Sequence, residues 1–129
     1  MNNGNNKIQK FTDLYAWQEG HKLVLMVYRE TESFPEKERY GLTDQMRRAS
    51  VSITSNIAEG FSRRSAKEKN RFYDMAQASL VELQNQLIIS KDVRYLSTEK
   101  FKVIAEQSIT THKLINGLMR STKDKNFKA

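Results

Sequence analysis

The chain has 129 residues, no cysteine and a formal net charge of +7. This length suits one domain with a single hydrophobic core. The lack of cysteine excludes a disulfide scaffold, a thiolate metal site and a cysteine nucleophile. No segment has the pattern of a signal peptide. The most apolar run, Leu23 to Tyr28, is far shorter than the roughly twenty residues that a membrane span needs. We therefore expect a cytoplasmic protein.

The first of four stretches with helical periodicity spans about residues 13–31. Thr12 or Asp13 is expected to cap its start. The apolar face predicted from three- and four-residue steps consists of Leu14, Trp17, His21, Val24 and Tyr28.

The second predicted helix spans about residues 44–61, after a break at residues 32–41 that contains Pro35 and Gly41. Thr43 is its expected N-cap. Its apolar stripe is formed by Met46, Ala49, Ile53, Ile57 and Phe61.

The third and fourth predicted helices span about residues 66–94 and 98–120. Ser65 and Glu68 have the spacing of a capping box, and Ser97 is the expected cap of the fourth helix. The connections at residues 62–65 and 95–97 are short, so neighbouring helices should be antiparallel. The prediction is an all-α protein with a single antiparallel up-down four-helix bundle at residues 11–120. A disordered N-terminal arm at residues 1–10 and a disordered basic C-terminal tail at residues 121–129 should flank it.

Positive charge is concentrated in three segments. Residues 1–10 carry +2, residues 63–71 carry +4 and residues 120–129 carry +3, whereas the rest of the chain sums to −2. The first turn of a helix that starts near residue 66 also presents free backbone amides and the positive end of the helix dipole. The charge distribution alone favours a basic surface that serves solubility, and a patch that binds phosphates is the alternative, which the start of this helix could hold. The predicted nucleic-acid-binding residues are Arg63, Arg64, Lys67, Lys69, Lys123 and Lys125.

A polar stripe accompanies the apolar one on the second helix, and the third helix has a similar stripe. Folding the two helices about a turn near residue 64 places residues opposite each other when their numbers sum to about 128–130. Two acid–base pairs, Arg48 with Glu82 and Glu59 with Arg71, then meet near opposite ends of the contact. Such pairs are best known as devices that fix register. A polar groove for a ligand and a seam between subunits are the alternatives.

No sequence motif for catalysis or metal binding is found. The Glu-x-x-His motifs of di-iron bundles are absent, because Gln18 and Ile109 stand three residues before His21 and His112. HExxH, GxSxG, Walker A and GxGxxG patterns are absent as well. We therefore expect no enzymatic activity, no cofactor and no metal.

The run from Phe34 to Leu83, FPEKERYGLTDQMRRASVSITSNIAEGFSRRSAKEKNRFYDMAQASLVEL, resembles one family closely. It is similar to the four-helix bundle proteins first noticed as open reading frames in intervening sequences of large-subunit ribosomal RNA genes. Upstream, Phe11 to Leu14 and Trp17-Gln18 also fit. Residues that match the family pattern are Phe34, Pro35, Glu38, Tyr40, Gly41, Leu42, Gln45, Arg47, Arg48, Ala49, Ser52, Ile53, Asn56, Ile57, Ala58, Glu59, Gly60, Arg63, Ser65, Glu68, Arg71, Phe72, Ala76, Ser79, Glu82 and Leu83.

This resemblance implies an up-down bundle that assembles as a homo-oligomer, often a ring-shaped homopentamer, and it supplies no catalytic residues. A related branch includes the accessory variability determinant of diversity-generating retroelements, a basic pentamer that binds a reverse transcriptase and nucleic acid. The first functional hypothesis is therefore an oligomeric adaptor that binds RNA, DNA or a nucleoprotein, such as a reverse transcriptase or a ribosomal component. The second is a protein–protein scaffold with no nucleic-acid role.

Overall fold

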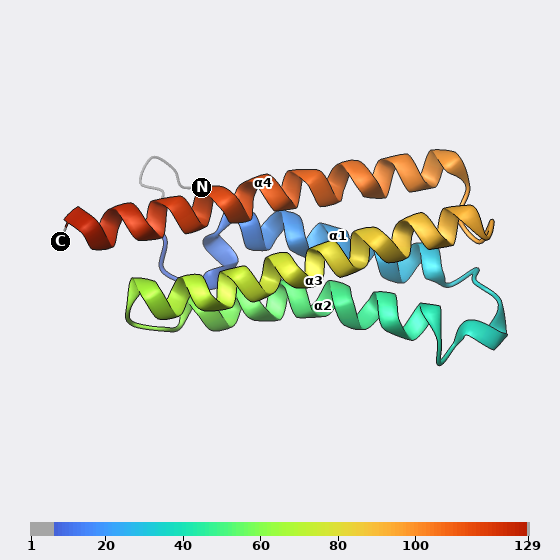
Figure 1. The fold of residues 1–129 in the computed structure, drawn as a ribbon, viewed down its shortest axis with the longest axis horizontal. Helices are drawn as coiled ribbons and strands as arrows, with labels where there is room; N and C mark the ends of the chain where they lie inside the picture. Colours follow the sequence, from blue (N-terminus) through green and yellow to red (C-terminus); the bar gives the residue numbers. More distant parts are fainter. Residues whose placement is uncertain (1–6, 129) are drawn as a thin grey trace.

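The computed structural model describes residues 7–128, with side chains up to Lys125, and shows four long helices. These are α1 (Tyr15–Thr31), α2 (Leu42–Phe61), α3 (Ala66–Asp92) and α4 (Thr98–Lys128). Two short 3₁₀ helices, η1 (Phe11–Asp13) and η2 (Glu36–Glu38), precede α1 and α2. Consecutive helices run in opposite directions (Figure 1), so the predicted antiparallel four-helix bundle is confirmed. Each helix packs against the next one in sequence, and α4 packs against α1 to close the bundle.

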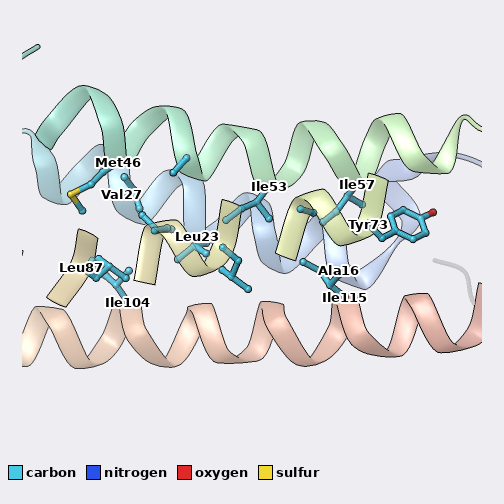
Figure 2. Packing of buried hydrophobic residues seen from close by; sticks show 14 of the residues in the cluster. Ala16, Leu23, Val27, Met46, Ile53, Ile57, Tyr73, Leu87, Ile104 and Ile115 are labelled. Carbon is cyan, nitrogen blue, oxygen red and sulfur yellow. The ribbon is translucent and has the colours of Figure 1, made fainter. Parts of the chain in front are cut away.

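One continuous core runs along the bundle, with side chains from all four helices (Figure 2). The stripe predicted for α2 is confirmed at Met46, Ala49, Ile53 and Ile57, which are all buried, whereas Phe61 at the end of the helix is half-buried. The α3 and α4 side chains buried against it include Tyr73, Ala76, Leu80, Leu83, Leu87, Ile104 and Ile115.

The buried face of α1 differs from the predicted one. His21 and Tyr28 are exposed, and the buried positions are Ala16, Gly20, Leu23, Val27 and Thr31. The prediction followed the bulkiest side chains, but the bundle places small residues at the closest helix contacts. A Cβ on Gly20 would lie 3.2 Å from the Thr54 methyl group of α2, so the absence of a side chain allows the two helices to approach.

The start of α2 is capped from the preceding segment and not, as predicted, by Thr43. The helix begins at Leu42, and Thr43 is buried inside its first turn. The Glu38 carboxylate accepts hydrogen bonds from the Leu42 amide at 3.1 Å and from the Tyr95 hydroxyl at 3.0 Å. Both interactions hold the pKa of Glu38 below its ordinary value. Glu38 therefore ties the start of α2 to the segment that follows α3.

The start of α1 also departs from the prediction. The helix begins at Tyr15, two or three residues after the expected caps, and Leu14 occupies its N-cap position. The Asp13 carboxylate instead accepts hydrogen bonds from the amides of Gln9 and Lys10, at 2.9 and 3.0 Å. These backbone bonds lower the pKa of Asp13. Asp13 thus orders the entry into η1.

The predicted serine caps are found. Ser65 accepts a hydrogen bond from the Glu68 amide at 3.0 Å, and Ser97 accepts one from the Lys100 amide at 3.2 Å. Among the described residues, the Glu68 carboxylate does not complete the capping box and instead forms an ion pair with Arg71. The third helix ends at Asp92, two residues before the predicted end, because Arg94 has a left-handed backbone with φ of 70°.

The fourth helix is longer than predicted. It continues to Lys128, so the boundary expected at Arg120 is wrong. The segment after Gly117 contains no proline or glycine, and its basic residues interact favourably with the negative end of the helix dipole. Of the predicted N-terminal arm, residues 1–6 lie outside the described residues. Between residues 7 and 128, no helix is long and apolar enough to cross a lipid bilayer.

Candidate nucleic-acid interface

Three segments meet at one end of the bundle: the α2–α3 turn, the C-terminal part of α4 and the chain that leads into α1 (Figure 1). They enclose a hollow of about 340 Å³ that is open to solvent. Its apolar wall is formed by Ile8, Leu14, Phe61, Tyr73 and Leu118. The long α4 supplies one side of the hollow, because the helix continues past the turn that joins its neighbours.

Three cationic side chains line the same hollow. Arg64 and Lys69 come from the α2–α3 segment, and Lys125 comes from the last turns of α4. Burial and the nearby Lys125 charge both lower the pKa of Lys69, with burial as the larger cause. No carboxylate is among the lining residues of the described chain. The fold therefore brings part of the predicted basic turn together with part of the predicted basic tail.

Lys69 is the most constrained of these cations. Its ammonium group donates a hydrogen bond to the Phe61 carbonyl oxygen at 2.7 Å and lies 5.1 Å from the centre of the Phe61 ring. The carbonyl belongs to the last residue of α2, where a positive charge compensates the helix dipole. Two of its three N–H groups remain for another acceptor. Lys69 thus has a structural role in addition to any role in binding.

The other predicted binding residues are placed differently. Arg63 forms an ion pair with Glu59 at 2.6 Å and lies 4.5 Å from the centre of the Phe72 ring, so its charge is already partly compensated. Lys67 and Lys123 are exposed and do not line the hollow. Of the six predicted residues, Arg64, Lys69 and Lys125 converge on the hollow.

The alignment of α2 and α3 is close to the one predicted. The hydroxyl oxygens of Ser52 and Ser79 are 2.8 Å apart and share a hydrogen bond between the two helices. Asn56 donates a second bond to the Ser52 hydroxyl at 3.1 Å. The polar stripes therefore do face each other at the middle of the contact.

The acid–base pairs predicted from this alignment are wrong for the single chain. Among the described residues, Arg48 forms an ion pair with Asp44 at 3.6 Å and Arg71 with Glu68 at 3.5 Å. Glu59 pairs with Arg63, and Glu82 accepts a hydrogen bond from Gln86 at 3.3 Å. All four residues of the predicted pairs are exposed. Exposed long side chains find partners three or four residues away on their own helix, where less ordering is needed than across a gap between helices.

Most of the residues that line the hollow were not predicted from the sequence. Tyr73, which lines the hollow, is 1% exposed. Burial raises its pKa to about 12, so the hydroxyl stays protonated. On α4, the lining residues Leu118, Ser121, Thr122 and Lys125 follow steps of three, one and three residues, which is one face of a helix. This periodicity predicts the lining face of α4 only if the helix continues past Arg120, where the sequence analysis expected it to end.

The two histidines lie outside the hollow. His21 stacks on Trp17 with 4.8 Å between ring centroids, and His112 hydrogen-bonds Gln77 and Asn116. Among the described residues, no group of three or more His, Asp or Glu side chains is arranged to hold a metal ion.

Comparison with known families matches residues 12–117 to the family described as 23S rRNA-intervening sequence protein. No curated protein matches the chain. Among solved structures, the chain is similar to a crystal structure of a protein with unknown function from the S23 ribosomal protein family of Bacteroides thetaiotaomicron VPI-5482. The two share 18% identity with a TM-score of 0.72, over 81% of this chain and 97% of the other. At this identity the likeness concerns the fold.

Proposed function

Because the chain belongs to the 23S rRNA-intervening sequence protein family, we propose that it is a non-enzymatic, oligomeric bundle protein that binds RNA or an RNA–protein particle. The binding surface is the basic end of the bundle, defined by Arg64, Lys67, Lys69, Lys123 and Lys125. The observation that carries this proposal is the convergence of Arg64, Lys69 and Lys125 on one hollow that has no carboxylate in its described lining.

The charge arrangement at the basic end favours a polyanion. Lys125 is close enough to Lys69 to disfavour the charge of Lys69, and an anion placed near both would relieve this repulsion. Ala66, the first residue of α3, also lines the hollow, so the positive end of the α3 dipole adds to the field of the cations. Phosphate groups of a nucleic-acid backbone meet both conditions.

The salt dependence of RNA affinity tests this proposal. The informative variant has Arg64, Lys67 and Lys125 changed together to Ala, because Lys69 also caps α2 and its loss would perturb the fold. For single-stranded RNA the slope of log K against log salt concentration falls by about 0.7 for each phosphate that the protein no longer neutralises. We expect the variant to bind more weakly and with a slope smaller by about 2.

A matched control removes the same amount of charge elsewhere. Three exposed cations lie at the opposite end of the bundle (Figure 1). Lys37 is in η2, Arg39 directly follows η2, and Lys102 is near the start of α4. Changing these three to Ala should leave the slope nearly unchanged. If both triple variants bind RNA as tightly as the wild-type chain, the basic end is not the binding surface.

The oligomeric state is a second part of the proposal. Arg48, Glu59, Arg71 and Glu82 lie exposed along α2 and α3 and have only local partners among the described residues, so they are available to pair across subunits. Nearby, Val51 and Met75 leave 39% and 44% of their surface exposed. We propose a homo-oligomer, with a homopentamer as the expected form. Native mass spectrometry should then give five times the 15.0 kDa chain mass, and a monomer would contradict this part.

Charge reversal tests the seam between subunits. Changing Arg48 to Glu should weaken assembly, and adding Glu82→Arg should restore it if the two side chains meet across the seam. A double variant that assembles no better than the single one places the seam elsewhere.

We further propose that the natural complex includes a nucleoprotein enzyme, such as a reverse transcriptase, or a ribosomal component, and that it forms in the cytoplasm. The basic end would then hold RNA while the partner acts on it. Purification of the complex followed by RNA and protein identification tests this step. Recovery of the protein with no RNA and no RNA-processing partner would contradict it.

The alternative function is a protein–protein scaffold. Exposed apolar side chains on α3 favour it, since Val81 and Ile88 leave 56% and 48% of their surface exposed. A complex that survives nuclease treatment and high salt would support the scaffold, whereas an RNA-mediated complex should dissociate under both conditions.

A further inference from the structure

The hollow at the basic end has an apolar interior, which binding to phosphates alone does not explain. Phe61 and Tyr73 supply aromatic surface, and Leu14 and Leu118 supply aliphatic surface. A site that bound only a phosphate backbone would need exposed cations and no apolar recess. The volume of about 340 Å³ falls at the lower end of the range typical of small-molecule pockets.

Hydroxyl groups are also present in the hollow. Tyr73 is 1% exposed and contributes its hydroxyl-bearing ring to the wall of the hollow. Ser121 and Thr122, on α4, also line the hollow. The Thr122 hydroxyl donates to the Leu118 carbonyl at 2.8 Å and can still accept a bond. A ligand with its own hydrogen-bonding groups can bond these hydroxyls, so it fits this recess better than a purely aliphatic one.

Cations stand beside this recess. Arg64, Lys69 and Lys125 contribute positive charge, and the described lining has no acid to compensate it. A ligand that satisfies all three features is flat or compact, carries hydrogen-bond donors and acceptors, and has an anionic group attached to it. A nucleotide has this combination, because its base is a planar polar heterocycle and its phosphate is anionic.

We propose that the hollow binds a single unpaired nucleotide of an RNA strand, with the base in the recess and its phosphate at Arg64, Lys69 and Lys125. This inference rests on the proposed RNA-binding function and specifies how that function recognises single strands. The base packs against the aromatic and aliphatic wall, and its polar edge hydrogen-bonds Tyr73 and Ser121. Duplex RNA keeps its bases stacked inside the helix and reaches only the charged surface.

Filling the recess tests the proposal without changing any charge. Ser121 is exposed at the mouth of the hollow, so Ser121→Phe should fold and occupy the space for the base. Ser33→Phe is the matched control, since Ser33 is exposed in the connection between α1 and α2. We expect Ser121→Phe to weaken binding of a short single-stranded RNA by about tenfold, the usual scale for one stacked base, and Ser33→Phe to have no effect.

The probe supplies a second, independent comparison. A strand of the same length that lacks its bases should bind the wild-type chain about tenfold more weakly than the complete strand. The Ser121→Phe variant should not distinguish the two strands, and duplex RNA should bind both proteins equally. Tyr73→Phe removes one oxygen atom and should weaken binding of the complete strand severalfold while leaving the salt slope unchanged.

The possible outcomes separate this inference from the function on which it rests. If the wild-type chain binds no RNA, both are wrong. A second outcome is that the salt slope of RNA binding depends on the basic end, but Ser121→Phe binds like the wild-type chain and the strand without bases binds like the complete strand. The nucleotide pocket is then wrong, and the charged interface stands. A third outcome is that oleate binds the hollow, that Ser121→Phe blocks oleate binding, and that the same substitution leaves RNA binding unaffected. The hollow is then a site for an aliphatic anion, and the nucleotide pocket is again wrong.

Discussion

A Cβ atom on Gly60 would lie only 2.7 Å from the Tyr73 ring, so α2 and α3 touch at a point where only glycine fits. Gly60 is buried near the end of α2, and Tyr73 is one of the largest fully buried side chains. This contact fixes the Tyr73 ring against the core, at the wall of the hollow.

Gly60→Ala should therefore destabilise the protein. Overpacking at a rigid aromatic ring costs about 1–3 kcal/mol, which outweighs the gain in helix propensity. Urea denaturation measures the effect. Gly117→Ala is the matched control, because a Cβ at Gly117 meets nothing within 4 Å and should stabilise α4 by roughly 0.5–1 kcal/mol. If Gly60→Ala also stabilises the protein, the close contact is not present in solution.

Arg47→Lys should destabilise the bundle although the charge is kept. The Arg47 guanidinium donates to the Thr31 hydroxyl at 2.9 Å and to the Tyr28 carbonyl at 3.3 Å, and it lies 4.7 Å from the centre of the Tyr28 ring. A lysine offers no planar fork for these contacts, and we expect a decrease of about 1–2 kcal/mol in unfolding free energy, measured by urea denaturation.

The neighbouring residue is the control for this substitution. Arg48 is exposed and, among the described residues, pairs only with Asp44, and lysine keeps the charge that the proposed seam would use, so Arg48→Lys should change stability by less than about 0.5 kcal/mol. Equal effects at the two positions would show that Arg47 does not hold the end of α1 to α2.

Arg94→Gly should stabilise the protein. The left-handed backbone of Arg94 disfavours any residue with a Cβ, and glycine adopts it without strain. We expect a gain of about 1 kcal/mol in unfolding free energy and a higher Tm. Arg94→Ala removes the same charge but keeps the Cβ, so it should not reproduce the gain. A gain of the same size with Ala would mean that charge, and not backbone strain, is responsible.

Glu38→Gln should lower stability at neutral pH and have little effect in acid. The pKa of Glu38 is lowered in the folded protein by the Leu42 amide and the Tyr95 hydroxyl. A carboxyl whose folded pKa is depressed contributes stability above its unfolded pKa, near 4.5, and loses it as the pH falls through the folded pKa. The difference between wild type and variant should therefore be largest above pH about 5 and vanish toward lower pH.

Glu36→Gln serves as the reference in the same segment. Within the part of the chain that the structure describes, the Glu36 carboxylate has only a 3.5 Å ion pair with Arg39 at the surface, and its loss should matter little at any pH. Chemical denaturation across the acid range measures both variants. A Glu38 effect that persists unchanged in acid would rule out its carboxylate as the stabilising group.

The second helix shows why most of the fold could be predicted. Met46, Ala49, Ile53 and Ile57 recur at steps of three and four, and this pattern alone determines which side of the helix is buried. The third and fourth helices and their serine caps follow from equally local signals. Residues close in sequence carry this information, so no knowledge of the rest of the fold is needed.

The features that the sequence did not predict correctly depend on contacts between segments. The buried face of α1 depends on how closely Gly20 can approach Thr54. The predicted ion pair between Arg48 and Glu82 rests on the alignment of the two helices alone. Solvent-exposed side chains gain little free energy by bridging two helices. The hollow could not be predicted, because it exists only where Ile8, Tyr73 and Lys125 meet.

The order in which the helices pack affects how fast the chain folds. Among the four long helices of the described chain, only the contact between α1 and α4 joins helices that are not consecutive. Most contacts form within a helix or across one short connection, so few long loops have to close before the core forms. Helical bundles with such local topology fold in roughly microseconds to milliseconds. We expect the α1–α4 contact to form last, and substitutions in it to speed unfolding more than they slow folding.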